Sequence, residues 1–140
     1  MAKIGMIGAG SWGIALSVLL HNNGHDVTVW SALADEIEML DREHEHNEKL
    51  PGVKLAEDIV FTTALAEAVK EKDILVLAVP SSFTRTTAHS MKELVAKGQI
   101  LVNVAKGIEE STLMTLSQVI EDEIPQADVA VLSGPSHAEE

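Results

Sequence analysis

Three glycines near the start of the chain stand at a spacing that could serve phosphate binding. They are Gly8, Gly10 and Gly13 in the stretch GAGSWG, which fits the pattern G-x-G-x-x-G. In this pattern the first glycine permits a tight turn, the second lets a pyrophosphate approach the main chain, and the third lets helix and strand pack closely. The spacing therefore predicts a dinucleotide site, with a glycine-rich turn needed only for packing as the alternative.

The residues on either side of the glycines predict a strand before them and a helix after them. Residues 3–7 (KIGMI) form a short apolar run typical of a buried strand. Residues 14–20 (IALSVLL) are mostly apolar, and the predicted helix ends at Asn23 and Gly24, where glycine fits the position just past a helix end. A helix that starts at the glycines would direct its free N–H groups and partial positive charge toward a phosphate.

Beyond this first unit the chain alternates between strand-like and helix-like stretches. The run 73–79 (DILVLAV) is almost entirely apolar, which indicates burial on both faces, as in a parallel sheet. Short connections between alternating elements imply right-handed βαβ crossovers. The predicted fold class is therefore α/β: a Rossmann-type doubly wound parallel sheet of about six strands with helices on both faces. The other predicted strands are 26–30, 59–62, 100–105 and 128–133, and the other predicted helices are 33–47, 63–71, 83–96 and 112–123.

The end of the second predicted strand should show which dinucleotide is used. An acid about 20 residues beyond the glycines is typical of NAD binding, whereas a nearby arginine accepts the extra phosphate of NADP. This chain has Ser31 and Ala32 there, and the nearest acids, Asp35 and Glu36, are predicted to start the next helix. Ser31 could bond a ribose hydroxyl or a phosphate. The sequence therefore leaves both NAD and NADP open as the cofactor. It slightly favours NAD, because no cationic residue follows the second predicted strand to bind the extra phosphate of NADP.

The composition narrows the classes of partner. The formal net charge is −12, from 22 acidic and 10 basic residues. Such a surface repels polyphosphate backbones, so we expect no nucleic-acid binding. The chain has no cysteine, which excludes disulfides and thiolate chemistry. No apolar run reaches the roughly 18 residues that cross a bilayer, so we expect a cytoplasmic protein without membrane insertion.

Two histidines in the stretch DREHEHNEK (residues 41–49) raise the question of a metal site. His44 and His46 are two positions apart, and side chains at i and i+2 do not share a helix face. We therefore expect no metal site here and interpret the stretch as the solvated end of a helix.

Five motifs occur in a fixed order: GAGSWG, NEKLPG, AVPS, KGIE and LSGPSHAEE. Together, from Met1 to Glu140, they resemble the N-terminal half of bacterial-type NAD(P)-dependent glycerol-3-phosphate dehydrogenase. The resemblance implies reversible hydride transfer between NAD(P)H and dihydroxyacetone phosphate, which gives sn-glycerol 3-phosphate for phospholipid synthesis. It also implies that residues 1–140 are an N-terminal NAD(P)-binding Rossmann domain, and that a helical substrate domain with the principal catalytic lysine lies outside this chain.

The resemblance assigns roles to matching positions. Lys106 of KGIE would contact both the nicotinamide cofactor and the substrate. Hydride transfer to a ketone leaves negative charge on the carbonyl oxygen, which an ammonium group after the fifth strand could stabilise. Ala32 stands where the family often has arginine, and His137 where it often has phenylalanine. The resemblance also implies cofactor contacts by Ser11, Trp12, Pro80 and Ala138, in addition to Gly8, Gly10, Gly13 and Ser31. It implies substrate contacts by Gly134 and Ser136.

Two other functions share the glycine turn. One is a stand-alone dinucleotide-binding module that turns nothing over, and the other is another small Rossmann reductase, such as a pyrroline-carboxylate or ketopantoate reductase. KGIE together with SGPS favours the dehydrogenase, because a sensor needs no substrate contacts. Without its helical partner the domain should also expose an apolar face, through which a homodimer could form.

Overall fold

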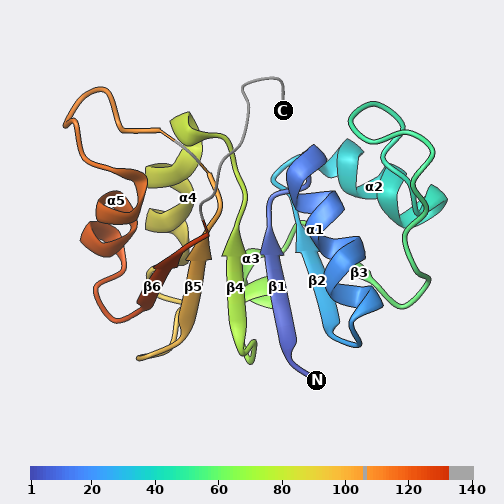
Figure 1. The fold of residues 1–140 in the computed structure, drawn as a ribbon, viewed down its shortest axis with the longest axis horizontal. Helices are drawn as coiled ribbons and strands as arrows, with labels where there is room; N and C mark the ends of the chain where they lie inside the picture. Colours follow the sequence, from blue (N-terminus) through green and yellow to red (C-terminus); the bar gives the residue numbers. More distant parts are fainter. Residues whose placement is uncertain (106, 133–140) are drawn as a thin grey trace.

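A parallel sheet of six strands forms the centre of the computed structural model, which describes residues 1–105 and 107–132. The strand order is β3-β2-β1-β4-β5-β6, and every neighbouring pair is parallel (Figure 1). The order reverses between β1 and β4, so the predicted doubly wound sheet is confirmed. The strands are β1 (Lys3–Ile7), β2 (Asp26–Trp30), β3 (Val60–Thr62), β4 (Ile74–Leu77), β5 (Ile100–Asn103) and β6 (Asp128–Val131).

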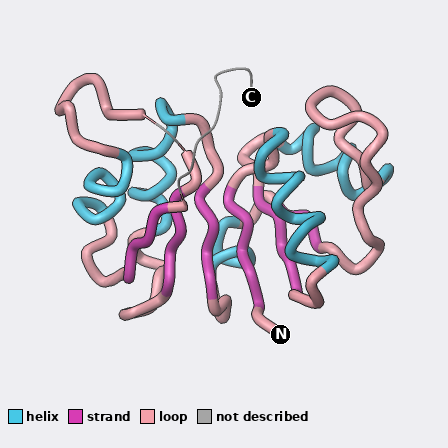
Figure 2. The backbone as a smooth tube through the Cα atoms, in the orientation of Figure 1, coloured by secondary structure: helices cyan, strands magenta, loops and turns pink. Residues whose placement is uncertain are grey.

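The helices lie between the strands along the chain and cover both faces of the sheet. Figure 2 shows the alternation of helix and strand through the described residues. Helices α1 and α2 lie beside β1–β3, whereas α4 and α5 lie beside β4–β6 (Figure 1). The helical segments are α1 (Ser11–Asn22), α2 (Ala34–Glu43), α3 (Leu65–Val69), the 3-10 turn η1 (Ser81–Phe83), α4 (Thr84–Met91) and α5 (Leu116–Glu123).

The sheet separates two apolar cores. Val76 of β4 belongs to the core that α1 and α2 close, whereas its neighbours Leu75 and Leu77 belong to the core under α3, α4 and α5. All three side chains are buried. Because successive side chains on a strand point to opposite faces, burial on both faces requires an unbroken apolar run. This confirms the interpretation of residues 73–79.

Several elements are shorter than predicted, for local reasons. The helix predicted over 33–47 ends at Glu43, because His44 adopts a left-handed conformation (φ 51°). The helix predicted over 112–123 begins only at Leu116, where the Thr115 hydroxyl accepts from the Gln118 N–H and the Gln118 side chain accepts from the Thr115 N–H. This reciprocal capping box fixes the start of a helix.

The strands predicted over 73–79 and 100–105 leave the ladder two residues early, at Leu77 and Asn103. Asn103 is buried, and its side chain bonds both the N–H and the C=O of Ala105 (3.1 and 3.3 Å). These bonds turn the chain away from β5. Both departures occur at the carboxyl edge of the sheet, where they shape a cleft. In residues 1–105 and 107–132, none of the helices is long and apolar enough to cross a membrane.

Candidate functional site

A cleft of about 720 Å³ opens at the carboxyl edge of the sheet. The residues that follow β1, β2, β4 and β5 line it, together with the start of α1 and one side of α4. Its volume falls in the range of ligand-binding clefts, about 300–1,000 Å³. It also lies at the reversal of strand order, which is where open α/β sheets bind their ligands.

Two of the three motif glycines are required by the packing of the protein itself. Gly8 has a φ of +125°, and a Cβ atom there would lie 2.6 Å from the carbonyl oxygen of Ala78. A Cβ atom on Gly13 would overlap the carbonyl oxygen of Gly8. Gly8 lets the turn lie against the residue that follows β4, and Gly13 lets α1 lie against the turn. A glycine turn needed only for packing therefore explains both glycines.

Gly10 differs from the other two. Its backbone is ordinary, with φ −75° and ψ −177°, a conformation that any residue adopts. A Cβ atom there would meet no atom of the described chain within 4 Å, and Gly10 lines the cleft. The fold therefore does not need glycine at this position. A side chain there would instead occupy space in the cleft beside the start of α1, which is the space a pyrophosphate needs.

The start of α1 suits an anion. The first bond inside the helix runs from the Ile14 N–H to the Gly10 carbonyl (2.9 Å), so the amides before Ile14 have no partner within the helix. As far as the structure describes this turn, it contains no acidic side chain and no side-chain cap. The partial positive charge of the helix end therefore stays available to a ligand.

Ser11 and Trp12 have different surroundings. The Trp12 side chain is half exposed and lines the cleft. The Ser11 hydroxyl donates instead to the carbonyl oxygen of Lys49 (2.7 Å), which ties the segment after α2 to the glycine turn. Contact of either side chain with a cofactor stays a prediction.

A group of four polar side chains, here called the Glu36 network, lies at the β2 end of the cleft. The Ser31 hydroxyl donates to Glu36 Oε1 (2.6 Å) and accepts from the Leu33 N–H (3.1 Å). Glu36 Oε2 accepts from His46 Nε2 (2.7 Å) and Lys49 Nζ (3.2 Å). Because His46 Nδ1 accepts from the Lys49 N–H (3.2 Å), its ring is the neutral tautomer with the proton on Nε2.

Glu36 is ionised despite its burial. Its side chain is 9% exposed, and its partners are Ser31, His46 and Lys49. Burial raises the pKa of this carboxyl, but the hydrogen bonds from His46, Ser31 and Lys49 outweigh that effect and hold the pKa below its ordinary value. The cleft therefore carries a fixed negative charge close to the end of β2.

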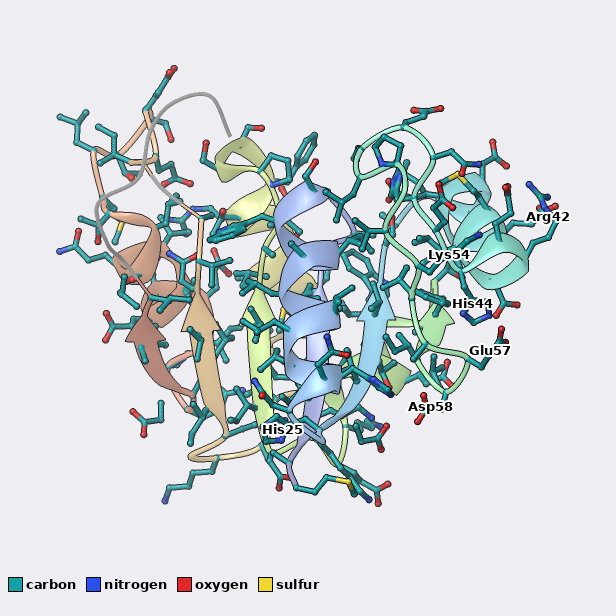
Figure 3. The ribbon with its side chains drawn as sticks, turned by 45° about the vertical axis from the view of Figure 1, so that its right-hand side comes forward. His25, Arg42, His44, Lys54, Glu57 and Asp58 are labelled. Atoms are coloured by element: carbon teal, nitrogen blue, oxygen red, sulfur yellow. The ribbon has the colours of Figure 1, made fainter. Side chains whose placement is uncertain are left out.

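The interpretation of residues 41–49 as a solvated helix end is wrong for His46. Its side chain is 2% exposed, and its Nε2 lies 2.7 Å from Glu36 Oε2. His44 points elsewhere: its ring lies edge-on to Phe61 (centroids 5.5 Å apart), and its Nε2 lies 3.5 Å from Glu57 on the outer side of this region (Figure 3). The two histidines have different neighbours, and in the described ranges no three histidine, aspartate or glutamate side chains gather to hold a metal ion.

Sequence reasoning missed the wall formed by α4 and by Phe83, the last residue of η1. Phe83, Thr86, Thr87 and Ser90 all line the cleft. Their spacing of three, four and seven residues places them on one helical face, so this spacing could have identified the wall. Glu36 and Lys49 were also missed as lining residues, because only the hydrogen bonds between distant segments bring them to the cleft.

The predicted site residues fall into three groups. Gly8, Gly10, Trp12, Ser31 and Pro80 line the same cleft, whereas Ser11 and Gly13 support the turn beneath it. Four predicted residues, Lys106, Gly134, Ser136 and Ala138, lie outside the residues that the structure describes. Ala105, which precedes Lys106, lines the cleft.

The strand order and the glycine turn define the class of fold, a Rossmann-type α/β domain. The family model described as NAD-dependent glycerol-3-phosphate dehydrogenase N-terminus matches residues 3–140, and the chain belongs to this family.

Similar proteins agree with this assignment. The chain is 64% identical over 140 residues to the glycerol-3-phosphate dehydrogenase [NAD(P)+] of Agathobacter rectalis, and 54% identical over 142 residues to that of Fusobacterium nucleatum. In both cases it covers 100% of itself and 42% of the relative. The crystal structure of glycerol-3-phosphate dehydrogenase from Coxiella burnetii superposes with a TM-score of 0.90 at 29% identity, over 98% of this chain and 42% of that one. The chain thus spans about two fifths of the length of the relatives it matches.

Proposed function

We propose that residues 1–140 form the N-terminal NAD(P)-binding domain of a glycerol-3-phosphate dehydrogenase. In this reaction the nicotinamide of NAD(P)H supplies a hydride to the carbonyl carbon of dihydroxyacetone phosphate, a proton joins the carbonyl oxygen, and sn-glycerol 3-phosphate is formed. The observation that carries the proposal is the open space at Gly10, beside the start of α1. Packing within the chain accounts for Gly8 and Gly13 but does not require glycine at position 10, which lines the cleft.

The residues of the described chain fit the cofactor's pyrophosphate. The chain's formal net charge of −12 repels an anion at long range, so the attraction must be local. The amides at the start of α1 supply it, because they lack partners within the helix and carry the positive end of its dipole. Gly10 lets the phosphates reach those amides, while Trp12 and Pro80 add apolar lining to the cleft.

Lys106 is proposed to contact both nicotinamide and substrate. The buried Asn103 bonds Ala105 and so fixes the main chain just before it at the cleft. An ammonium group at this edge would stabilise the negative charge that hydride transfer places on the substrate oxygen. Gly134 and Ser136 are proposed as substrate contacts and Ala138 as a nicotinamide contact, from the family resemblance.

Cofactor binding separates this proposal from a turn that serves only packing. Trp12 and Trp30 both line the cleft, so a titration with NADH or NADPH should change the intrinsic fluorescence of the chain. We expect saturable binding of at least one dinucleotide. Absence of a response to either at millimolar concentration would contradict the proposal.

Gly10 and Gly13 provide a matched pair of substitutions. Gly10→Val should weaken dinucleotide binding by at least about tenfold and lower stability by no more than about 1 kcal/mol, because its side chain enters open space but is a poor N-cap residue for α1. Gly13→Ala should lower stability by about 1–3 kcal/mol, because its Cβ overlaps the Gly8 carbonyl. Urea unfolding of each variant separates the two effects. Equal binding by wild type and Gly10→Val would contradict the proposed role of the turn.

Catalysis by the 140-residue chain alone should be negligible, because we propose that the principal catalytic lysine lies in a further domain. The measurement is reduction of dihydroxyacetone phosphate, followed by loss of NADH absorbance. Robust turnover would contradict this division of labour. A stand-alone binding module would also bind without turnover. A longer chain, extended to the length of the relatives, separates the two functions. Reduction of dihydroxyacetone phosphate by that longer chain would favour the dehydrogenase, and its absence would favour the binding module.

We further propose that the protein acts in the cytoplasm in glycerophospholipid synthesis and forms a homodimer. The edge strand β6 carries Val131, which is 55% exposed, and Leu132 follows it at 53%. An exposed apolar edge of this kind favours association with a second copy. Sedimentation should show a concentration-dependent dimer, and a clean monomer at high concentration would contradict that part of the proposal.

A further inference from the structure

We infer that Glu36 makes the cleft select NAD over NADP. The inference rests on the proposed function, because it requires the cleft to bind a nicotinamide dinucleotide. It concerns the β2 end of the cleft, where the sequence shows neither an acid nor an arginine directly after the strand.

Glu36 occupies the place at which Rossmann domains distinguish the two cofactors. Residues 30–33, which end β2 and lead into α2, line the cleft together with Glu36. The group that follows the second strand meets the adenosine ribose, whose 2′ position carries a hydroxyl in NAD and a phosphate in NADP. Here the acid comes from the first turn of α2 and is held at the strand end by the Ser31 hydroxyl, at 2.6 Å.

The hydrogen bonds of Glu36 leave room for a hydroxyl donor and none for a phosphate. A carboxylate has about four acceptor positions on its two oxygens. Ser31 uses one on Oε1, whereas His46 and Lys49 use two on Oε2. One further N–H or O–H group can donate to Oε1. A phosphate has no such donor when ionised, and its charge would repel the carboxylate.

Lys49 does not offset this preference in the wild-type chain. Among the described residues that line the cleft, Glu36 and Lys49 are the only ones charged at neutral pH. Lys49 Nζ lies 3.2 Å from Glu36 Oε2, so its charge is directed at the carboxylate. Its side chain is 44% exposed, which leaves it free to turn toward a ligand once the carboxylate charge is removed.

The network also fixes Glu36 in one position. Its side chain is 9% exposed and that of His46 is 2% exposed, so neither can turn away into solvent. The neutral His46 ring donates to Glu36 and accepts from the Lys49 N–H, which locks its orientation. A phosphate therefore cannot displace the carboxylate at low cost, and selectivity is built into the resting cleft.

The test is the ratio of NADPH to NADH dissociation constants in the full chain and in Glu36→Gln, measured by tryptophan fluorescence. Wild type should bind NADH more tightly. Glu36→Gln keeps the shape of the side chain and frees Lys49, so it should shift the ratio toward NADPH by about tenfold or more. Adding Lys49→Met to Glu36→Gln should remove most of that gain.

Asp35→Asn is the matched control, because it removes the same charge from the same helical turn at a residue outside this cleft. It should leave the ratio within about twofold, since an exposed charge at this distance is screened. Thermal melting checks that each variant is folded. Tighter NADPH binding by wild type, or equal shifts in Glu36→Gln and Asp35→Asn, would overturn the inference while leaving the proposed function intact. Failure of wild type to bind either cofactor would overturn both.

Discussion

The two halves of the sheet each carry a network of charged side chains, and the two networks are built in opposite ways. In the Glu36 network one buried carboxylate receives three donors and faces the cleft. In the other half, Arg85 of α4 donates to three carboxylates, at 2.7 Å to Glu109, 2.8 Å to Asp122 and 2.7 Å to Glu123. We call this group, with His89 on Glu123, the Arg85 network.

The difference lies in what each network joins. The Arg85 network connects α4, the segment after β5 and α5, and none of its members lines the cleft. The Glu36 network connects α2 and the segment after it to the end of β2, directly at the cleft. Similar ionic chemistry therefore joins packed elements in one half and lines the cleft in the other. If the cleft binds the dinucleotide as proposed, substitutions should separate stability from binding accordingly.

The largest effect should come from His46→Ala. It creates a cavity beneath α2 and removes a donor from the buried Glu36, which should lower stability by about 2–4 kcal/mol. Dinucleotide affinity should fall as well, because Glu36 loses its support. Urea unfolding and fluorescence titration measure the two quantities. His89→Ala, at an exposed histidine of the Arg85 network, is the control and should change neither by much.

Arg85→Met should lower stability and leave binding unchanged. Without the guanidinium, the carboxylates of Glu109, Asp122 and Glu123 repel one another, so the Tm should fall by several degrees. Added salt should restore part of the loss by screening that repulsion. NADH affinity should stay within about twofold of wild type. A large loss of affinity with an unchanged Tm would reverse the roles assigned to the two networks.

Acid should weaken both networks. Hydrogen bonds from Arg85 lower the pKa of Glu109, and those from His89 and Arg85 lower the pKa of Glu123. The pKa of Glu36 is lowered too, although burial opposes it. A carboxyl whose folded pKa lies below its ordinary value of 4.5 stabilises the fold above that pH, and this contribution is lost as pH falls through the folded pKa.

The Tm should therefore be nearly flat above pH 5 or so and fall below the ordinary carboxyl pKa. Arg85→Met should show a shallower fall, because protonation then relieves repulsion among carboxylates instead of breaking bonds to Arg85. Thermal melts in buffers of equal ionic strength measure both profiles. Identical slopes in wild type and Arg85→Met would show that the Arg85 network does not contribute to acid sensitivity.

Ser31→Ala should give the smallest effect. It removes the hydroxyl that donates to Glu36 and accepts from the Leu33 N–H, at a cost of about 1 kcal/mol. His46 and Lys49 still hold the carboxylate, so cofactor selectivity should shift less than in Glu36→Gln. Urea unfolding and the two titrations measure these changes. A selectivity shift as large as that of Glu36→Gln would assign the discrimination to Ser31 instead.

The glycine turn and the doubly wound parallel sheet followed from sequence because their causes are local or periodic. The apolar run 73–79 encodes burial on both faces, and alternating elements encode parallel crossovers. Element ends were less predictable. The left-handed conformation of His44 ends α2 early, and neither apolar periodicity nor composition specifies it.

The charged networks could not be predicted, because each joins residues far apart in the chain. Glu36 and His46 are ten positions apart, and Arg85 and Glu123 are 38 apart. Charge patterns along one helix say nothing about such pairs, so Glu36 was assigned to a helix start and His46 to a solvated helix end. By contrast, the cleft-lining face formed by Phe83 of η1 and by Thr86 and Ser90 of α4 could have been predicted from its spacing.

The most direct test of the central claim is the response of backbone amides to NADH in a two-dimensional ¹⁵N–¹H NMR titration of the chain. A diphosphate that rests on the start of α1 should shift the amide signals of Ser11, Trp12 and Gly13 more than those of α5, and Gly10→Val should abolish the response. Saturable binding that leaves those three amides unshifted would contradict the account.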